Sequence, residues 1–272
     1  MHPLIAVGTA LITGAGSGIG RSIALKFAER GCQKLFLVDI NKAGLTETQR
    51  LVTDMAPSAK TAVHITNVTV AAEVEAMVAA CVEAFGRIDF AMNNAGIAQG
   101  GVRTTETSTA MFDRTIDVNE RGVFLCEKYE IRQMLQQEPL PIFTGAKAER
   151  NVRGSIVNTC SLAGFSVLAN LSAYTSSKHA VYVLTRVDAR QFAPQQIRVH
   201  SVCPGFVPTP LMAAAGMPDQ FYEDTKTESA QNRMTDPEEI AQGVLFLSTS
   251  FAAAITGVNL SIDSGAGLYH VY

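Results

Sequence analysis

The sequence has no block of basic residues, and its formal net charge is −3. A protein that binds nucleic acid needs a basic surface for the phosphates, so nucleic acid is not an expected partner. No apolar run reaches the length of a membrane span, and the first residues lack the basic, then apolar, pattern of a secretory signal. We therefore expect no membrane association and a cytoplasmic location.

Cysteine pairs with the spacing of redox or metal motifs are also lacking. The five cysteines are scattered, and none belongs to a Cys-x-x-Cys pair. Most lie within apolar runs, so we interpret them as buried free thiols in a reducing compartment. The five histidines are equally scattered. Because no group of residues has metal-ligand spacing, the sequence predicts no metal site.

The chain does contain a regular alternation of strand-like and helical patterns. Its 272 residues are 47% apolar, which is enough for a substantial core. Short apolar runs predict strands at residues 9–13, 34–40, 61–66, 88–93, 154–159, 197–202 and 258–263. Helical spacing predicts helices at residues 18–30, 42–55, 71–85, 108–136, 172–193 and 237–248.

This alternation is typical of a parallel sheet with helices on both faces. The strands are apolar and several are rich in β-branched residues, as expected for strands covered on both sides. Since no repeat or linker divides the chain, we predict an α/β fold: one domain over residues 1–272 with a doubly wound, seven-stranded parallel sheet. Residues 206–234 are predicted to form a lid over the substrate crevice, with an ordinary surface helix pair as the alternative.

A glycine-rich turn follows the first predicted strand. The segment Gly14-Ala-Gly-Ser-Gly-Ile-Gly20 stands between an apolar run and a helical pattern. In the order strand, turn and helix, such glycines let the backbone approach a pyrophosphate at the positive end of the helix dipole. We therefore expect a dinucleotide site, with a purely structural tight turn as the alternative.

The choice of dinucleotide depends on Asp39, which lies nineteen residues after Gly20 at the end of an apolar run. A carboxylate there accepts hydrogen bonds from the adenosine ribose and repels a 2′-phosphate. Neither Ser17 nor Ile40 supplies a basic side chain for such a phosphate. The sequence therefore favours NAD over NADP. An alternative role for Asp39, compatible with the first, is to cap the helix that starts near Lys42.

Tyr174 and Lys178 are four residues apart in a predicted helix, so they share one of its faces. A neighbouring ammonium favours the phenolate, and we expect it to lower the pKa of the tyrosine. An unperturbed phenol titrates near ~10, so a base that works near neutrality needs a decrease of roughly 3 units. The alternative is that both side chains lie on a solvated helix face.

Together these motifs resemble the short-chain dehydrogenase/reductase family, and the resemblance covers nearly the whole chain. The glycine turn looks like the family's cofactor turn, and Asn93-Asn94-Ala95-Gly96 looks like its motif after the fourth strand. Asn119 resembles the asparagine of its long fourth helix, and Ser161 precedes Tyr174 by thirteen residues, as in its catalytic set. Pro204-Gly205-Phe-Val207-Pro-Thr209 is similar to the segment that holds the nicotinamide amide.

The resemblance implies a Rossmann fold and a role for each matching residue. Tyr174 would exchange the substrate proton, while Lys178 would hold the phenolate and bond the nicotinamide ribose. Ser161 would orient the substrate oxygen, and Asn119 would steady a water that links Lys178 to solvent. The cofactor residues implied are Gly14, Ser17, Gly18, Ile19, Gly20, Asp39, Ile40, Asn67, Val68, Asn94, Ala95, Gly96, Lys128, Tyr174, Lys178, Pro204, Gly205, Val207 and Thr209.

Several of these positions carry open alternatives: Ser161 could simply cap the next turn, and Asn119 could bond only to neighbouring backbone. The family usually has an aspartate that meets the adenine amino group where this chain has Asn67. An amide oxygen can accept the same hydrogen bond without a charge, so we expect adenine binding with some loss of affinity. Lys128 lies nine residues after Asn119 and is either a cofactor contact or a solvated helix lysine.

The implied reaction is hydride transfer between NAD(H) and a secondary alcohol or ketone. An apolar pocket without lysine or arginine suits a lipophilic ring compound such as a steroid, terpenoid or polyketide of secondary metabolism. The candidate pocket residues are Ile97, Leu162, Phe165, Leu168, Leu171, Phe206, Leu211, Met212, Met217, Phe221 and Tyr222.

The alternatives are a non-redox enzyme of the same fold that retains a nicotinamide cofactor, such as an epimerase, dehydratase or cyclase, and a binding protein that senses NAD redox state. The resemblance also implies a homodimer or homotetramer built through the long fourth and fifth helices.

Overall fold

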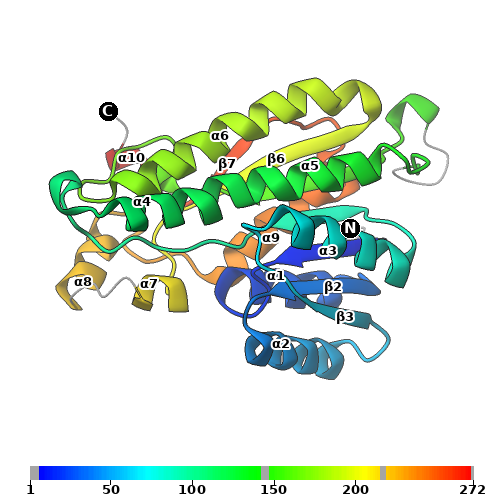
Figure 1. Ribbon diagram of the computed structural model, residues 1–272, viewed down its shortest axis with the longest axis horizontal. Helices are drawn as coiled ribbons and strands as arrows, with labels where there is room; N and C mark the ends of the chain where they lie inside the picture. The colour runs from blue at the N-terminus through cyan, green and yellow to red at the C-terminus, as the bar shows by residue number, and fades with distance from the viewer. Residues whose placement is uncertain (1–5, 142–146, 215–218, 271–272) are drawn as a thin grey trace.

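The computed structural model describes residues 6–141, 147–214 and 219–270. Its centre is a seven-stranded sheet with the order β3-β2-β1-β4-β5-β6-β7, in which every neighbouring pair is parallel (Figure 1). The strands are β1 (Thr9–Thr13), β2 (Lys34–Asp39), β3 (Lys60–Ile65), β4 (Phe90–Asn93), β5 (Gly154–Thr159), β6 (Ile197–Pro204) and β7 (Asn259–Ile262).

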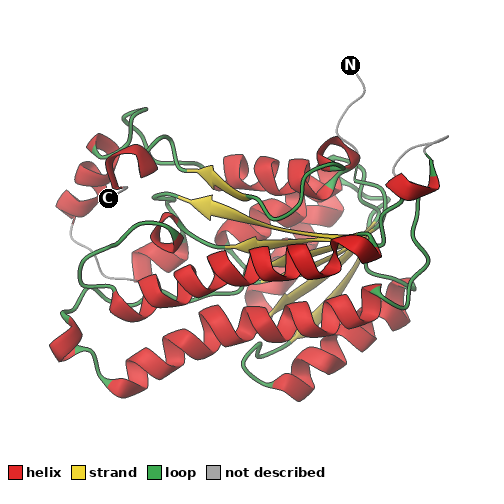
Figure 2. Ribbon diagram, turned by 90° about the horizontal axis from the view of Figure 1, so that it is seen from above, coloured by secondary structure: helices red, strands yellow, loops and turns green. Residues whose placement is uncertain are grey.

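Helices occupy the connections between the strands and lie on both sides of the sheet (Figure 2). They are α1 (Gly18–Glu29), α2 (Lys42–Met55), α3 (Ala71–Phe85), α4 (Thr109–Ile116), α5 (Gly122–Met134), α6 (Ser172–Phe192), α7 (Pro210–Ala214), α8 (Asp219–Thr227), α9 (Pro237–Ser248) and α10 (Gly267–His270). The predicted α/β fold with a doubly wound parallel sheet is confirmed, and the ends of the predicted strands and helices lie within two residues of the observed ones.

Local signals explain where several helices begin and end. Asp236 caps α9: its Oδ1 accepts a hydrogen bond from Glu238 N at 2.7 Å, and Glu239 Oε2 accepts one from Asp236 N at 2.8 Å. This reciprocal pair satisfies backbone donors that a helix start leaves open. At the other end of a helix, Gly86 terminates α3 with φ +88°, a conformation that glycine adopts without steric cost.

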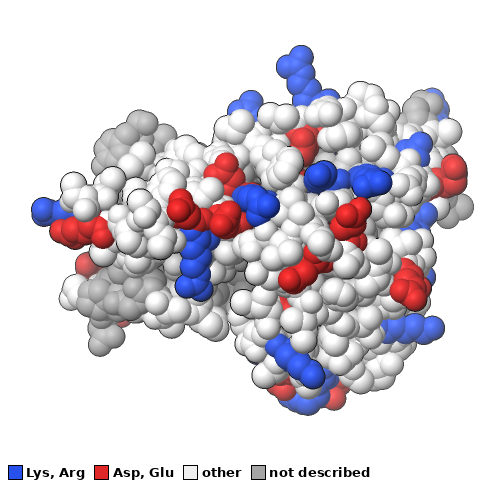
Figure 3. Space-filling model, in the orientation of Figure 1, with Lys and Arg blue, Asp and Glu red and all other residues white. Residues whose placement is uncertain are grey.

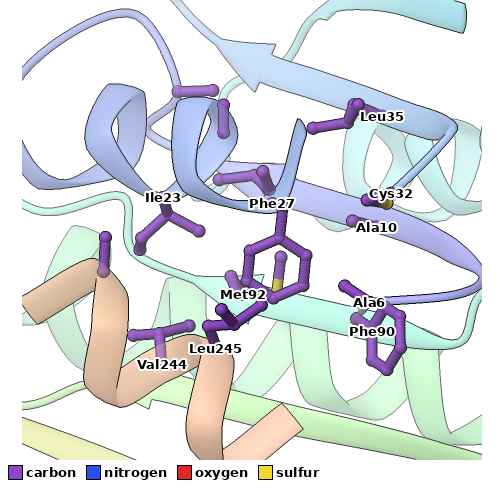
Figure 4. Packing of buried hydrophobic residues seen from close by; sticks show 14 of the residues in the cluster. Ala6, Ala10, Ile23, Phe27, Cys32, Leu35, Phe90, Met92, Val244 and Leu245 are labelled. Atoms are coloured by element: carbon purple, nitrogen blue, oxygen red, sulfur yellow. The ribbon is translucent and has the colours of Figure 1, made fainter. Parts of the chain in front are cut away.

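The alternation of side chains along β1 divides the core between the two faces of the sheet. Ala10 and Ile12 belong to a cluster with residues of α1 and α9, whereas Leu11 belongs to a second cluster with residues of α3 and α5. Figure 4 shows the first cluster, with Phe27 of α1 directed toward Met92 of β4. Burial of each such large apolar side chain contributes about 1.5–3 kcal/mol, so both helical layers are held firmly on the sheet.

The order of the strands reverses at β1, which lies between β2 and β4. In parallel sheets of this kind, a ligand crevice forms beyond the carboxyl ends of the strands at such a point. The glycine turn follows β1 there, and the segment that begins with Asn94 follows β4. The fold therefore brings two of the predicted motifs to the same edge of the sheet.

The helix predicted at residues 108–136 contains an irregularity that periodicity does not reveal. A π-helical turn, Asp117–Arg121, joins α4 to α5. Such single turns inside α-helices occur frequently at functional sites. Asn119, one of the predicted catalytic residues, lies within this turn and is fully buried.

The segment 206–234 contains α7 and α8, which lie at the end of the molecule where α4 begins (Figure 1). Residues 215–218 of this segment lie outside the described residues. Its action as a lid stays a prediction.

Charged side chains of both signs are interspersed over the face shown in Figure 3. Among residues 6–141, 147–214 and 219–270, no helix is both long and apolar enough to cross a membrane. All five cysteines are free thiols and buried, as their sequence positions predict, and the reducing compartment stays a prediction.

Candidate active site

The glycine turn is packed so tightly that side chains would not fit within it. A Cβ on Gly20 would lie 2.1 Å from the carbonyl oxygen of Gly14, closer than any real contact. Gly18 has φ +49°, and a Cβ there would lie 3.3 Å from Thr209 Cβ. The turn therefore brings bare backbone to the start of α1 and to the segment after β6, as a pyrophosphate site requires.

The first turn of α1 has no side-chain cap. Ser17 occupies the cap position with extended backbone, but its side chain makes no capping hydrogen bond. The first N–H groups of a helix have no partner within the helix, and the helix dipole adds a partial positive charge there. This donor set, together with the glycine backbone, fits the pyrophosphate of a dinucleotide.

Asp39 is tied to the glycine turn by its own carboxylate. Its Oδ2 accepts a hydrogen bond from Gly16 N and its Oδ1 accepts one from Asn41 N, each at 2.9 Å. Asn41 caps α2, because its Oδ1 accepts a hydrogen bond from Gly44 N at 3.1 Å. The alternative role of Asp39 as the helix cap is therefore wrong, and its carboxylate stands at the edge of the turn.

A relay of hydrogen bonds joins the glycine turn to β4 and β5. Thr13 Oγ1 accepts from Asn94 N at 3.0 Å and from Ala95 N at 3.2 Å. Asn94 Nδ2 donates to Gly14 O at 3.4 Å, and Asn94 Oδ1 accepts from Thr159 Oγ1 at 3.1 Å. Asn94 thus fixes the ends of three strands relative to one another.

The segment after β6 packs against the glycine turn. A Cβ on Gly205 would lie 2.9 Å from Asp263 Cα, so the chain passes close to the loop after β7. Val207 is buried against the core, and Thr209 lies beside Gly18. Pro204 is the last residue of β6. These four predicted cofactor residues stand together at the crevice.

Two predicted cofactor residues contact other parts of the protein. Asn67 Oδ1 accepts from both the backbone and the hydroxyl of Thr69, at 3.1 and 2.9 Å. An adenine contact by that oxygen would have to displace one of these bonds. Val68 is buried beneath Gly122.

Lys128 is not brought to the crevice. It is exposed on α5, and its Nζ lies 5.1 Å from the centroid of the Tyr129 ring. Its neighbours Glu127 and Glu130 face the core instead. Helical spacing accounts for this arrangement, because residues one position apart do not share a face. Lys128 is a solvated helix lysine, the alternative reading of the sequence.

Tyr174 and Lys178 lie in the first two turns of α6, as their spacing predicts. The lysine is 5% exposed, and its Nζ lies 5.7 Å from the centroid of the tyrosine ring. The same Nζ donates a hydrogen bond to Thr159 O, at the end of β5, at 2.8 Å. A solvated helix face is therefore wrong, because the ammonium is buried against the sheet.

Ser161 follows β5 and completes the cluster. Its hydroxyl partly lowers the pKa of the Tyr174 phenol, because it can hydrogen-bond to the phenolate. The serine Oγ accepts from Ala163 N at 3.1 Å, which leaves the hydroxyl proton free to be donated. Ser161 is buried, with 8% of its surface exposed.

The pKa of Tyr174 does not shift in the expected direction. Burial raises it above 10.0, the hydrogen bond from Ser161 lowers it in part, and Cys160 raises it further. Burial also lowers the pKa of Lys178, against the raising effect of Cys160 and Cys203. The expectation that the protein alone lowers the pKa of the tyrosine is therefore wrong, because removal from water outweighs the neighbouring groups.

Asn119 makes its contacts with backbone. Its Oδ1 accepts from Ile97 N at 2.8 Å, and its Nδ2 donates to Ile97 O at 2.9 Å. A longer contact of 3.5 Å joins Nδ2 to Ser177 Oγ on α6. The side chain thus clamps the segment after β4, and its role beside a water stays a prediction.

Sequence reasoning missed two residues that contact this cluster. Gln99 Oε1 accepts from Tyr174 N at 3.1 Å, and Thr159 links Lys178 to Asn94. Neither belongs to a motif. Thr159 could have been found as the last residue of a predicted strand, whereas no spacing signals Gln99.

The candidate pocket residues have mixed environments. Leu162 is 2% exposed and the ring of Phe165 packs 6.3 Å from that of Tyr182, so both contribute to the core near the site. Leu211 of α7 is 39% exposed. Met217 and the side chain of Phe221 lie outside the described residues.

Comparisons with known proteins agree with this geometry. A family model described as enoyl-(acyl carrier protein) reductase matches residues 14–267. Levodione reductase of Leifsonia aquatica is 35% identical over 262 residues, which cover 94% of this chain and 92% of that protein. Cyclohexanol dehydrogenase of Acinetobacter sp. (strain SE19) is 37% identical over 256 residues, which cover 93% and 92%.

Solved structures are similar over the same extent. The crystal structure of levodione reductase has a TM-score of 0.85 at 32% identity and covers 99% of this chain and 100% of its own. That of 3-ketoacyl-(acyl-carrier-protein) reductase from Brucella melitensis, complexed with NADH, has a TM-score of 0.83 at 30% identity and covers 97% and 99%. The fold and site define a single-domain oxidoreductase of the Rossmann type. The chain belongs to the short-chain dehydrogenase/reductase family.

Proposed function

We propose that the protein transfers a hydride between NAD(H) and a secondary alcohol or ketone on a lipophilic ring. The observation that carries this proposal is a continuous path of hydrogen bonds between the two halves of the site. Lys178 Nζ bonds Thr159 O, Thr159 Oγ1 bonds Asn94 Oδ1, and Asn94 Nδ2 bonds Gly14 O. The path supports a shared site, because it links Lys178 of α6 to the glycine turn through three hydrogen bonds.

In the oxidation direction, Tyr174 as phenolate takes the hydroxyl proton of the substrate. Ser161 donates a hydrogen bond to the substrate oxygen and so orients it. Lys178 remains charged, and its ammonium group stabilises the neighbouring phenolate. An oxidised nicotinamide, when bound, would supply the hydride acceptor and a positive charge. That charge favours the phenolate, in opposition to the burial that raises the pKa of the tyrosine.

Three features of the turn support NAD over NADP. Asp39 places a carboxylate beside Gly16, where it repels a 2′-phosphate. Ser17 and Ile40 supply no positive charge. Arg21 is near, but its guanidinium already donates to Thr48 Oγ1 and to the carbonyl oxygen of Gly16. A 2′-phosphate would therefore meet the carboxylate of Asp39 without a basic side chain at position 17 or 40.

The names of the relatives support a ring substrate. Levodione reductase and cyclohexanol dehydrogenase are both named for a compound of that kind. A steroid, terpenoid or polyketide is the class that we propose for this chain, since apolar residues flank Ser161. Leu162 follows it directly and Phe165 packs nearby.

A homodimer or homotetramer is supported by an apolar hollow on the outer faces of α5 and α6. It has a volume of about 620 Å³ and is lined by side chains that include Phe124, Val183, Leu184 and Val187. Phe124, Val183 and Val187 are 48%, 57% and 51% exposed. Exposed apolar side chains gathered in this way mark association surfaces. We propose that a second copy of the chain covers them, and the buried free thiols support a cytoplasmic assembly.

The test is the formation of NADH from NAD with a panel of cyclic and acyclic secondary alcohols. We expect turnover with lipophilic ring alcohols, and one NADH for each ketone formed. Tyr174→Phe keeps the aromatic ring and removes the phenol hydroxyl that exchanges the proton. It should therefore lower kcat at least a hundredfold, in line with the size of general acid–base effects of about 10²–10⁴. The dissociation constant for NADH, followed by fluorescence, should change little. Retained turnover in the variant would show that another group carries the proton.

A further inference from the structure

Helix α6, which carries Tyr174 and Lys178, begins without a cap from its own sequence. Leu171 occupies the cap position and makes no side-chain capping hydrogen bond. The N–H groups of the first turn have no partner within a helix, and Tyr174 is the third residue of α6. The backbone of the tyrosine therefore depends on an acceptor from elsewhere in the chain.

Gln99 supplies that acceptor from a segment 75 residues earlier. Its Oε1 accepts from Tyr174 N at 3.1 Å, and its Nε2 donates to Thr107 Oγ1 at 3.3 Å. The side chain is 2% exposed, so water does not compete for either bond. An acceptor held at both ends and shielded from water has a nearly constant position.

The segment that carries Gln99 is itself fixed on both sides. Asn119 holds the backbone of Ile97 through two hydrogen bonds of 2.8 and 2.9 Å. Val102 N donates to Asn170 O at 3.0 Å, one residue before the cap position of α6. Gln99 thus links the first turn of α6 to the segment after β4, which is held against the sheet.

We propose that Gln99 is a positioning residue. By fixing the first turn of α6, it sets the position of the Tyr174 phenol relative to Ser161 and Lys178. The inference rests on the proposed function, in which that phenol exchanges the proton. Helix ends fray when their donors lack partners, and a displacement of the order of 1 Å is enough to impair catalysis. The hydrogen bond of Gln99 reaches the backbone N–H of Tyr174 and not its phenol.

Gln99→Leu removes both polar atoms at nearly constant volume. We expect kcat to fall about tenfold, which corresponds to about 1.4 kcal/mol. The KM for NAD should stay within a factor of about two, because the hydrogen bonds of the Gln99 side chain go to Thr107 and Tyr174. The apparent pKa of kcat/KM for the alcohol should rise, since a looser phenol loses the hydrogen bond of Ser161 that lowers its pKa before substrate binds.

Gln99→Glu keeps an acceptor oxygen for Tyr174 N in either protonation state. Its kcat on the alkaline plateau should return to within about threefold of the wild type, which is less than about 1 kcal/mol. Gln99→Asn retains the amide but is one methylene shorter, so it should behave as Gln99→Leu does. If Gln99→Leu does not fold, the comparison of the Asn and Glu variants decides the inference.

Gln137 offers a matched control at the far end of the sheet. It is 6% exposed, its Oε1 accepts from Ile88 N at 2.8 Å, and its Nε2 donates to Ile88 O at 2.9 Å. Gln137→Leu therefore removes a buried amide of the same kind without a change near α6. We expect a loss of stability, with kcat and its pH profile unchanged.

Hydrogen–deuterium exchange tests the contact without substrate or cofactor. Peptides that span residues 172–178 should exchange faster in Gln99→Leu than in the wild type, and at the wild-type rate in Gln99→Glu and Gln137→Leu. Equal exchange in Gln99→Leu and the wild type overturns the inference. An equal fall of kcat in Gln99→Leu and Gln137→Leu also overturns it, because it indicates general softening. If the wild type oxidises no alcohol, the proposed function fails and exchange alone decides the contact.

Discussion

We expect the protein to lose stability as the pH rises from 5 to 8, because α5 buries two carboxyl groups. Glu127 and Glu130 are both 0% exposed. Glu130 Oε2 accepts from Asn93 Nδ2 at 3.0 Å, and Glu127 Oε1 accepts from Asn158 Nδ2 at 2.8 Å. The second oxygen of each carboxyl has no hydrogen-bond partner among the described residues. Ionisation in such a place is costly, so burial raises the pKa of both groups.

The size of the effect follows from Glu130. Burial raises its pKa from 4.5 to about 7, against the partial lowering by Asn93. Because the folded state binds the proton more tightly, the stabilisation is fully present below the unfolded pKa and is lost as the pH rises through the folded one. Proton linkage then predicts a loss of about 2–3 kcal/mol between pH 5 and pH 8 from this group. Glu127 acts in the same direction.

Urea denaturation at several pH values measures this loss as a shift of the midpoint. Glu130→Gln keeps an acceptor for Asn93 and cannot ionise, so its loss between pH 5 and pH 8 should be smaller than that of the wild type by about 2 kcal/mol. Glu75→Gln is the control, because it makes the same substitution at a side chain that is 55% exposed. The same pH dependence in Glu130→Gln and the wild type would refute the reasoning.

Three further predictions concern the cofactor turn and the outer helices. Gly20→Ala places a Cβ 2.1 Å from Gly14 O, so NADH should bind at least tenfold more weakly by fluorescence titration, and an unchanged dissociation constant would contradict the packing of the turn. Asp39→Ala combined with Ile40→Arg should move the ratio of kcat/KM for the two cofactors at least tenfold toward NADP, whereas a constant ratio would reject the role of the carboxylate. Val187→Glu places a charge in the outer hollow and should reduce the mass seen by light scattering; a wild-type mass would exclude this face as the interface.

Much of the fold could be predicted because its signals are local. The run Thr9–Thr13 followed by the glycine turn and α1 needs only neighbouring residues, and Pro237 after Asp236 marks the start of α9 in the same way. The π-helical turn Asp117–Arg121 could not be predicted, since the apolar pattern runs through it without a break. It depends on packing of the segment after β4.

The candidate site divides along the same line. The spacing of Tyr174 and Lys178 predicts that they share a face, and the structure buries Lys178 beside a half-buried Tyr174. Their contacts with Thr159 and Gln99 cross 19 and 75 residues of sequence. Such contacts follow from the sheet order, which no short pattern encodes.

The amino-acid sequence alone determined the strand–turn–helix units, the order of the motifs and the one-face placement of the phenol and the ammonium, because each depends on the period of a helix or strand. Only the tertiary structure decided that burial raises the pKa of Tyr174, that Asn119 bonds backbone, and that Gln99 holds the start of α6. These properties depend on which distant segments exclude water from a group and supply its partners, and they arise only when the helices close on the sheet.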